Sequence, residues 1–332
     1  MFWHEKLGFT DFENGAQIET RAGRFTFNDG IWRQNGLYSP AQDQTGQSFA
    51  YKWHRRQSYD NPRFLETVGQ WLRERYLDND LDQLNSYFFD DALVLDAGCG
   101  AGMSASLLLG ERLRRVRYLG VDISGAVDVA KSRFASDGLP GEFIQADLMK
   151  LPFSGPTFDV ILSEGVLHHT DSVAGALKYL SGLLRPGGCF MFYVYRRKGP
   201  AREFTDDFIR DRLRPLDDSQ AWEALRPLSR LGQALGDLDV EVEVPEAVDL
   251  LGIPAGRIPL QRLIYWYFCK MHYQPDWDLE ELNHINFDWF RPLNCHRQSK
   301  EEVMQWCRDS ALTIERFNEQ ESGFTVAARK AS

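Results

Sequence analysis

The sequence predicts an α/β fold: a doubly wound, mostly parallel sheet of seven strands with a terminal antiparallel hairpin and an inserted, mainly helical cap. Three observations lead to this class. Short apolar strands alternate with helical segments between residues 92 and 196, as in proteins whose parallel strands are joined by helices. The alternation then stops over residues 197–298, a segment too long for a loop and too helical in pattern for a linker. It returns near the C-terminal end.

The alternating part is expected to contain five strands and three helices. The strands are expected at residues 92–98, 116–124, 141–148, 158–165 and 189–195, and the helices at residues 104–114, 125–136 and 171–184. Right-handed crossovers make a parallel, doubly wound order the default for such a chain. A helix after the interruption begins with Ser299 and has Glu302 three residues later, which is a capping box. The strands LTIERFN and GFTVAARK come next as a hairpin and bring the strand count to seven.

The N-terminal residues have a different character from this alternating part. They are rich in glycine, asparagine, glutamine and aromatic residues, and RFTFNDGIW (24–32) is typical of two short strands around an Asn-Asp-Gly turn. A helix with one apolar face is expected after Pro62. We therefore divide the chain into an N-terminal extension that covers the ligand site (1–60), an α/β core (61–196 and 299–332) and an inserted helical cap over the substrate (197–298).

The composition excludes several classes of protein. Of the 332 residues, 38 are Lys or Arg and 48 are Asp or Glu, so the net charge of −10 argues against a nucleic-acid or anionic-membrane partner. No apolar run approaches the ~20 residues that span a bilayer, and no secretory leader is visible. The five cysteines are scattered without a Cys-x-x-Cys pair, so neither a metal site nor a disulfide framework is expected. A cytoplasmic protein is expected.

The stretch DAGCGAG, Asp96 to Gly102, ends the first strand of the alternating part. Ligands of such sheets bind outside the carboxyl ends of the strands, beside the first strand-to-helix turn. The dinucleotide fingerprint G-x-G-x-x-G/A would place Met103 where a small residue is needed. A carboxylate beside the turn suits a cationic amino group better than a phosphate. Cys99 is interpreted as a small turn residue rather than a nucleophile.

These motifs resemble those of the class I S-adenosylmethionine-dependent methyltransferases, and the sequence is similar to the small-molecule branch that includes quinone-biosynthesis enzymes. VLDAGCGAG, LGVDIS, QADLMKLPF, SEGVLHHT and LLRPGGCFMF stand in the family's order between residues 92 and 196, and residues 299–330 match more loosely. The resemblance implies S-adenosylmethionine as cofactor, S-adenosylhomocysteine as product, and in-line transfer of a methyl group to an O, N, S or C atom of a small-molecule acceptor.

The resemblance also implies roles for single residues. Asp96 helps to hold the amino group, Asp122 takes the two ribose hydroxyls, and Asp147 accepts from the adenine amine. A carboxylate suits a vicinal diol on chemical grounds alone, because it presents two acceptor atoms. The expected cofactor-binding residues are Asp96, Gly98, Gly100, Gly102, Asp122, Ile123, Asp147, Leu148, Ser163 and Glu164. Tyr51 is added because its ring could face a sulfonium cation, although an aromatic staple onto the core explains it equally well.

The acceptor side is predicted less sharply. The mixed polar and aromatic stretch 284–298 is interpreted as a loop that returns from the cap into the site. Arg196 and Arg197 leave the fifth strand where they could hold an anionic acceptor, with a solvated basic face as the alternative. The substrate-binding candidates are Arg196, Arg197, Asn286, Asp288, Trp289 and Asn294. If the acceptor must lose a proton, the general-base candidates are His169, His284 and His296.

Two other functions remain open on the sequence alone. A non-catalytic S-adenosylmethionine-binding sensor or partner subunit would keep every cofactor motif. An NAD-dependent oxidoreductase is a weaker alternative, because it must tolerate Met103 and give Asp147 a different role. The sequence predicts neither the acceptor nor the oligomeric state.

Overall fold

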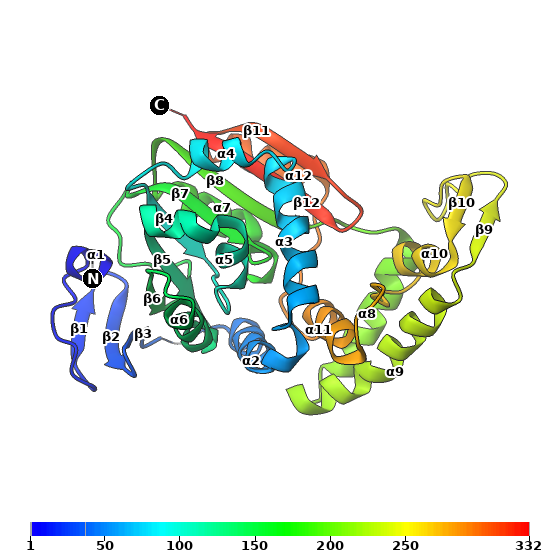
Figure 1. Ribbon diagram of the computed structural model, residues 1–332, viewed down its shortest axis with the longest axis horizontal. Coiled ribbons are helices and arrows are strands. Elements are labelled where there is room, and N and C mark those ends of the chain that lie inside the picture. Colours follow the sequence, from blue (N-terminus) through cyan, green and yellow to red (C-terminus); the bar gives the residue numbers. More distant parts are fainter. Residues whose placement is uncertain (1, 37, 332) are drawn as a thin grey trace.

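A central sheet of ten strands organises the molecule, whose computed structural model describes residues 2–36 and 38–331 (Figure 1). The strand order is β1-β2-β3-β6-β5-β4-β7-β8-β12-β11. Strands β6, β5, β4, β7 and β8 pair in parallel, whereas β12 is antiparallel to both β8 and β11. The predicted α/β class with a mainly parallel sheet and a terminal hairpin is therefore confirmed.

The sheet and the helices have these bounds. The sheet strands are β1 (Gln17–Thr20), β2 (Gly23–Asn28), β3 (Ile31–Gln34), β4 (Leu93–Ala97), β5 (Arg117–Asp122), β6 (Glu142–Gln145), β7 (Phe158–Glu164), β8 (Leu184–Tyr195), β11 (Leu312–Glu319) and β12 (Gly323–Lys330), and a separate pair is formed by β9 (Glu241–Val244) and β10 (Gly256–Pro259). The helices are α1 (Phe2–Lys6), α2 (Pro40–His54), α3 (Pro62–Leu77), α4 (Leu81–Tyr87), α5 (Met103–Leu109), α6 (Ala126–Ser136), α7 (Val173–Ser181), α8 (Pro200–Leu213), α9 (Asp218–Asp237), α10 (Leu260–Tyr267), α11 (Leu279–Phe290) and α12 (Lys300–Asp309).

The predicted count of seven strands is wrong, because the N-terminal strands extend the sheet by three. The expected pair around Asp29 and Gly30 is present as β2 and β3, and both turn residues have positive φ, 52° and 76°. Strand β3 then pairs in parallel with β6 at Trp32 and Arg33. The three N-terminal strands form an antiparallel meander, and docking of β3 onto the open edge of β6 covers that edge.

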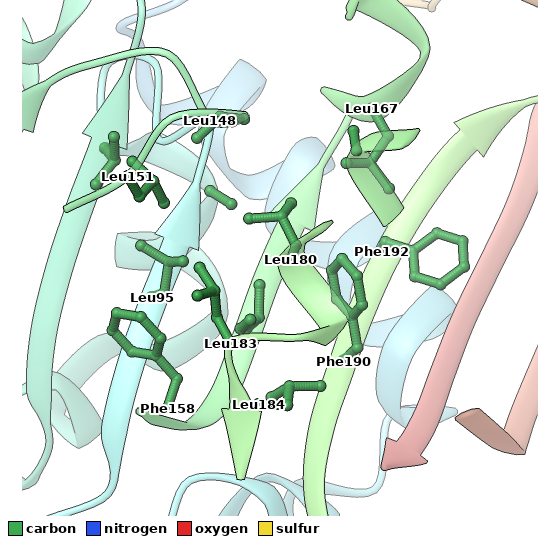
Figure 2. Packing of buried hydrophobic residues seen from close by; sticks show 14 of the residues in the cluster. Leu95, Leu148, Leu151, Phe158, Leu167, Leu180, Leu183, Leu184, Phe190 and Phe192 are labelled. Carbon is green, nitrogen blue, oxygen red and sulfur yellow. The ribbon is translucent and has the colours of Figure 1, made fainter. Parts of the chain in front are cut away.

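The core occupies both faces of the sheet. On one face, Leu95 of β4 and Phe190 and Phe192 of β8 pack in one cluster with Leu180 and Leu183, at and just after the end of α7, as Figure 2 shows. The intervening residues of the same strands, such as Val94 and Met191, belong to a second buried cluster on the opposite face. Burial of both faces is expected of a parallel sheet covered by helices, and it leaves the strand ends as the place for a ligand.

Residues 197–298 contain α8, α9, α10 and α11 together with the β9–β10 hairpin. Figure 1 shows α8, α9 and the hairpin on the side away from the N-terminal strands, with α11 between them and α3. Helix α11 overturns part of the interpretation of residues 284–298 as a loop, because residues 279–290 are helical. The helix shows no clean amphipathic pattern because eight of its twelve residues are buried.

Helix α11 also connects the two parts of the molecule. It packs against α9 and α8 and also against α2. Arg55, which directly follows α2, pairs with Glu280 of α11 at 3.0 Å, and Ser58 Oγ lies 2.9 Å from His284 Nδ1. Within the described residues, no helix is long and apolar enough to cross a membrane.

Candidate active site

A cavity of about 500 Å³ lies at the carboxyl ends of the parallel strands. Its wall contains two distinct groups of residues. The strand-end group comes from the turns after β4, β5 and β6 and comprises Gly98, Cys99, Gly100, Asp122, Ile123, Asp147 and Leu148. The aromatic–cationic group comes from α3, α10 and the loop after α10 and comprises Trp71, Arg75, Arg262, Tyr265, Trp266, Lys270 and His272.

The glycine turn after β4 requires glycine for two reasons. Gly98 and Gly100 have φ values of 93° and 50°, which side chains with a Cβ rarely adopt. A Cβ on Gly98 would also lie 2.3 Å from both methyl groups of Val166, and one on Gly100 would lie 2.9 Å from Trp53 Nε1. The backbone of this turn therefore borders the cavity directly. Gly102 does not line it; a Cβ there would instead meet the ring of Phe134 at 2.9 Å.

Asp122 ends β5 with a carboxylate that is already oriented. Its Oδ2 accepts from the Gly100 amide at 2.9 Å, and its Oδ1 accepts from the amide and hydroxyl of Ser124 at 2.8 and 2.7 Å. Burial raises the pKa of Asp122, and the donors from Ser124 and Gly100 oppose that rise. Free acceptor capacity remains on the carboxylate, so this side chain can receive two neighbouring hydroxyl groups from a ligand. Ile123 lines the cavity beside it.

Asp147 follows β6 and is held by the N-terminal strands. Its backbone amide donates to Gln34 Oε1 at 2.9 Å, while its Oδ1 accepts from the Met149 amide at 2.8 Å. Gln34 belongs to β3 and also donates to the Lys150 carbonyl at 2.9 Å. Asp147 and Leu148 both line the cavity. The contribution of residues 17–34 to the site is therefore to position this turn, whereas α2 provides N-terminal side chains that line the cavity.

Asp96 and Ser163 lie behind the cavity rather than in its wall. Asp96 is 3% exposed and its Oδ2 accepts from Tyr118 Oη at 2.7 Å. Burial raises the pKa of Asp96 to about 7. Ser163 Oγ donates to the Ala97 carbonyl at 2.8 Å and thereby joins β7 to β4. Neither is brought into contact with the cavity, because strand residues point alternately to the two sides of the sheet.

Cys99 and Glu164 do line the cavity. Burial raises the pKa of the Cys99 thiol, which keeps it protonated and unreactive. Glu164 is engaged within the protein: Arg75 Nη1 lies 3.0 Å from its Oε1, and Tyr76 Oη donates to its Oε2 at 2.6 Å. The Arg75 guanidinium in turn lies 4.6 Å from the ring centre of Tyr193.

Helix α2 lies over the strand ends and places Phe49, Lys52 and Trp53 on the cavity. Tyr51 points elsewhere: its ring packs against Phe287 at 5.7 Å and Trp222 at 6.2 Å. Tyr51 therefore does not face the cavity, and its ring packs on α9 and α11 of the 197–298 segment rather than on the α/β core as the alternative expected. Trp53 instead of Tyr51 presents its ring at the glycine turn.

Half-buried Asp288 of α11 is the centre of a polar cluster. It forms an ion pair with Lys52, and its Oδ2 accepts from Tyr195 Oη at 2.6 Å. Burial opposes ionisation of Asp288, but the Lys52 ammonium, within hydrogen-bond contact, holds its pKa well below the usual range. Burial in turn lowers the pKa of Lys52, and Asp288 opposes that change. Through Lys52, Asp288 and Tyr195, the cluster connects α2, α11 and the end of β8 at the cavity.

Among the general-base candidates, His169 and His284 line the cavity and His296 does not. His169 Nδ1 lies 2.6 Å from the carbonyl oxygen of Asn294. A carbonyl only accepts, so Nδ1 carries the proton and Nε2 keeps its lone pair. Nε2 is buried and finds no partner among the described residues. Burial lowers the pKa of His169 to about 4, so the ring is neutral near pH 7.

The other two histidines are placed differently. His284 is buried, shares a hydrogen bond with Ser58 and packs against the ring of Trp53 at 5.4 Å. Burial lowers its pKa well below the ordinary value. His296 is exposed on the chain return between α11 and α12, where its backbone amide donates to the His168 carbonyl at 2.9 Å. The structure therefore brings two of the three candidates to the cavity.

Of the six substrate-binding candidates, only Asp288 lines the cavity. Arg196 pairs with Glu319 at 3.5 Å and Arg197 pairs with Glu302 at 3.1 Å, both outside it. The remaining three are buried in structural hydrogen bonds. Asn286 Oδ1 accepts from the His272 amide at 2.9 Å, Trp289 Nε1 donates to Asp206 at 2.7 Å, and the Asn294 side-chain amide donates to Asp171 at 2.7 Å.

The residues that sequence reasoning missed are Lys52 and most of the aromatic–cationic group. The run LIYWYFCKMHYQPDW (263–277) does combine aromatic and cationic side chains in an unusual density. This pattern could have predicted a binding surface, because aromatic rings and cations together recognise flat or charged ligands. In the part of the chain that the structure describes, no three His, Cys, Asp or Glu side chains form a group that could hold a metal ion.

Comparison with known proteins finds matches to the middle of the chain. Residues 95–192 match the methyltransferase domain family. An uncharacterised methyltransferase of Bacillus subtilis, YodH, is 40% identical over 98 residues, which are 30% of this chain and 41% of that protein. The phthiotriol/phenolphthiotriol dimycocerosates methyltransferase of Mycobacterium leprae is 30% identical over 147 residues, 44% of this chain and 53% of that protein. The chain thus spans about half the length of these relatives.

A solved structure is similar more loosely. Magnesium protoporphyrin IX methyltransferase of Synechocystis PCC 6803 covers 87% of this chain with 98% of its own length, at 14% identity and a TM-score of 0.47. A similarity of this degree carries no information about the acceptor.

Proposed function

We propose that this chain, whose residues 95–192 form a class I S-adenosylmethionine-dependent methyltransferase domain, transfers the methyl group of S-adenosylmethionine to a small-molecule acceptor. The observation that carries the proposal is the juxtaposition of Gly98, Gly100, Asp122 and Asp147 on one wall of a cavity that extends beyond them. A site for the cofactor alone would not need the aromatic–cationic group on the same cavity.

The strand-end group fits the cofactor. Glycine at positions 98 and 100 permits the positive-φ turn whose residues line the cavity, so the cofactor's methionine and ribose parts can lie along this backbone. We assign the ribose hydroxyls to Asp122, whose two oxygens are fixed by Gly100 and Ser124. Asp147 is assigned to the adenine amine, with Leu148 packing beside the base. Asp96 is assigned no direct contact, because it lies behind the cavity wall.

When bound, S-adenosylmethionine supplies an electrophilic methyl carbon: the acceptor's lone pair forms the new bond, the carbon–sulfur bond breaks, and its electron pair stays on the sulfur of S-adenosylhomocysteine. The protein contributes alignment and a cavity from which water is excluded. Helices α2 and α11 close this cavity through the Lys52–Asp288 pair. If the acceptor atom carries a proton, Nε2 of His169 is the base that we assign to receive it, because it has a lone pair and no partner among the described residues.

The acceptor is proposed to be a small molecule held beneath residues 197–298, with α10 and the loop after it forming the cap over it. A net charge of −10 disfavours a nucleic-acid acceptor. The acceptor atom is left open, since a thiolate or an activated carbon would need no base.

The test is incubation of the purified chain with methyl-labelled S-adenosylmethionine and a small-molecule cell extract, followed by mass spectrometry of labelled products. Calorimetry with S-adenosylmethionine and with NAD runs in parallel. We expect binding of S-adenosylmethionine and a labelled product. Binding without any labelled product would favour a sensor or partner subunit, and tight binding of NAD alone would favour an oxidoreductase.

A further inference from the structure

Lys270 places a buried cation on the cavity without a carboxylate partner. The residue is 6% exposed and lines the cavity. Among the described residues its ammonium has neither a hydrogen bond nor an ion pair within 4.0 Å, and the contact that it does make is with the ring of Trp289, 4.8 Å away. Burial lowers the pKa of Lys270 to about 7, and the charges of Asp288 and Asp206 oppose that change.

Arg262 and His272 extend this group. Arg262 is half-buried, donates to the Tyr273 carbonyl at 3.1 Å and lies near the Tyr265 ring, but it has no ion pair among the described residues. His272 is 6% exposed, and neither ring nitrogen has a partner in the described chain. Burial, followed by the charges of Lys270 and Arg262, lowers the pKa of His272 well below its ordinary value. The three polar ends therefore form one local group.

Two other cations of the cavity have carboxylate partners. Lys52 is paired with Asp288, and Arg75 is paired with Glu164. Glu74, a carboxylate that also lines the cavity, accepts from Gln70 on the exposed side of α3. Lys270 and Arg262 are thus two cations of the cavity that have no ion pair within 4.0 Å among the described residues.

A cation removed from water without a counterion is costly, because desolvation is not repaid by a partner. Lys270, Arg262 and His272 all line the cavity and have no carboxylate partner among the described residues. An anionic group of a ligand could accept hydrogen bonds from all three. Charge-assisted hydrogen bonds of this kind are stronger than neutral ones. The missing partner is therefore expected on the ligand.

Aromatic rings surround these donors. The rings of Trp71 and His272 lie edge to face with centroids 6.3 Å apart, and Tyr265 lies 6.0 Å from His272. Trp266 packs on Tyr265 at 4.3 Å. Flat side chains of this kind favour a flat, unsaturated ligand body through stacked and edge-to-face contacts.

We propose that the methyl acceptor is an anionic molecule with a flat, unsaturated body, whose carboxylate binds to Lys270, Arg262 and His272 while the body packs against Trp71, Tyr265 and Trp266. This inference rests on the proposed function and narrows it to a class of substrate.

The first experiment separates a small-molecule cell extract by ion exchange into anionic, neutral and cationic pools. Each pool is incubated with the full chain and methyl-labelled S-adenosylmethionine. We expect label in a product of the anionic pool that absorbs in the near ultraviolet. Label confined to the neutral or cationic pool would overturn the acceptor class while leaving the methyltransferase activity in place. Absence of label in every pool would instead contradict the proposed function.

The second experiment tests the residues with the active pool. Lys270→Met and Arg262→Gln should each raise the KM for the acceptor at least tenfold, with the affinity for S-adenosylmethionine unchanged within twofold. The matched controls are Lys178→Met on the exposed side of α7 and Arg257→Gln on β10, which should change neither value. A parallel loss of S-adenosylmethionine affinity would overturn the assignment, because it would place these cations on the cofactor's own carboxylate. Retained cofactor binding also reports that each variant is folded.

Discussion

The strand-end group and the aromatic–cationic group line the same cavity but are built in opposite ways. In the first, each polar side chain lies within a few residues of the end of a parallel strand, and its position follows from the sheet. In the second, the side chains come from α3, α10 and the loop after α10, and α3 is far from the other two in the sequence. The Asp122 carboxylate is held by three donors, whereas neither ring nitrogen of His272 has a partner in the described chain.

The strand-end group is therefore oriented before a ligand binds, whereas the aromatic–cationic group depends on a ligand for its missing contacts. Carboxylates that are oriented by the protein bind a ligand with little rearrangement. Buried groups without partners gain stability when a ligand supplies the missing contacts. The strand-end group is therefore expected to act in the same way with any acceptor, and the aromatic–cationic group to decide which acceptor is used.

The largest effect is expected at the glycine turn. Gly98→Ala places a Cβ 2.3 Å from Val166 in a backbone conformation with φ of 93°, so the turn or Val166 must shift and the wall of the cavity changes shape. We expect affinity for S-adenosylmethionine to fall by about a hundredfold or more, the equivalent of roughly 2.7 kcal/mol. Calorimetry measures this, with circular dichroism to confirm folding. Gly155→Ala, where a Cβ meets nothing within 4 Å, is the control. A folded Gly98→Ala variant with normal affinity would contradict the proposed cofactor contact.

His169 lines the cavity but belongs to neither group. If Nε2 receives the acceptor's proton, His169→Gln should lower kcat by about a hundredfold, within the usual range for general-base catalysis, and leave cofactor affinity nearly unchanged. The exposed His54→Gln is the control. Because the pKa of His169 is about 4, the base is unprotonated above that pH, and the rate should fall only as the pH drops through about 4. An unaltered kcat in the variant would remove His169 from the mechanism.

Asp122 tests the strand-end group with a smaller change. Asp122→Ala removes both acceptor atoms for the ribose hydroxyls, and we expect affinity for S-adenosylmethionine to fall by more than tenfold, about 1.4 kcal/mol. Asp137→Ala on the exposed end of α6 should leave the affinity unchanged. Equal affinities of the two variants would refute the ribose assignment.

The smallest effect is expected at Asp96, which lies behind the cavity wall. Its folded pKa of about 7 lies above that of an unfolded aspartate, so its contribution to stability is present at low pH and is lost as the pH rises through about 7. Asp96→Asn has no carboxyl group to ionise, so it removes the free-energy cost of burying that charge at high pH. We expect its Tm to exceed that of the parent at pH 8.5 by roughly 2–4 °C, for about 1 kcal/mol, with a smaller difference at pH 5.5. The affinity for S-adenosylmethionine should change less than threefold. A tenfold loss would indicate that Asp96 contacts the cofactor directly.

The sequence predicted the strand-end group well because its geometry is local. The strand pattern and turn chemistry indicated the glycine turn at Gly98. Asp122 and Asp147, at or just after the ends of their strands, were implied by the resemblance to the methyltransferase motifs, which stand at those strand ends. The same reasoning could not separate Asp96 from the cavity wall, because one residue of displacement along a strand reverses the direction of a side chain.

Helix α11 shows why the acceptor side was harder to predict. His284, Ile285 and Asp288 line the cavity at positions i, i+1 and i+4 of one helix, whereas Asn286 and Trp289 do not line it. Asn286 bonds to Ser229 and to the backbone amide of His272, and Trp289 bonds to Asp206. When these residues are interpreted as a loop, no helical periodicity is available to distinguish those that line the cavity from those that do not. The helix is buried on several sides, so its sequence lacked the polar face that identifies surface helices.

The contacts between the α2 region and the α11 region also bear on how the chain folds. Lys52 and Asp288 are 236 residues apart in the sequence, Ser58 and His284 are 226 apart, and Thr45 and Asn294 are 249 apart. Contacts of such separation close large loops and are slow to form. During synthesis, α2 would leave the ribosome long before its partner exists, while β4 to β8 could already assemble. The closure of the cavity is therefore expected to be among the last events in folding, and the first to be lost in partial unfolding.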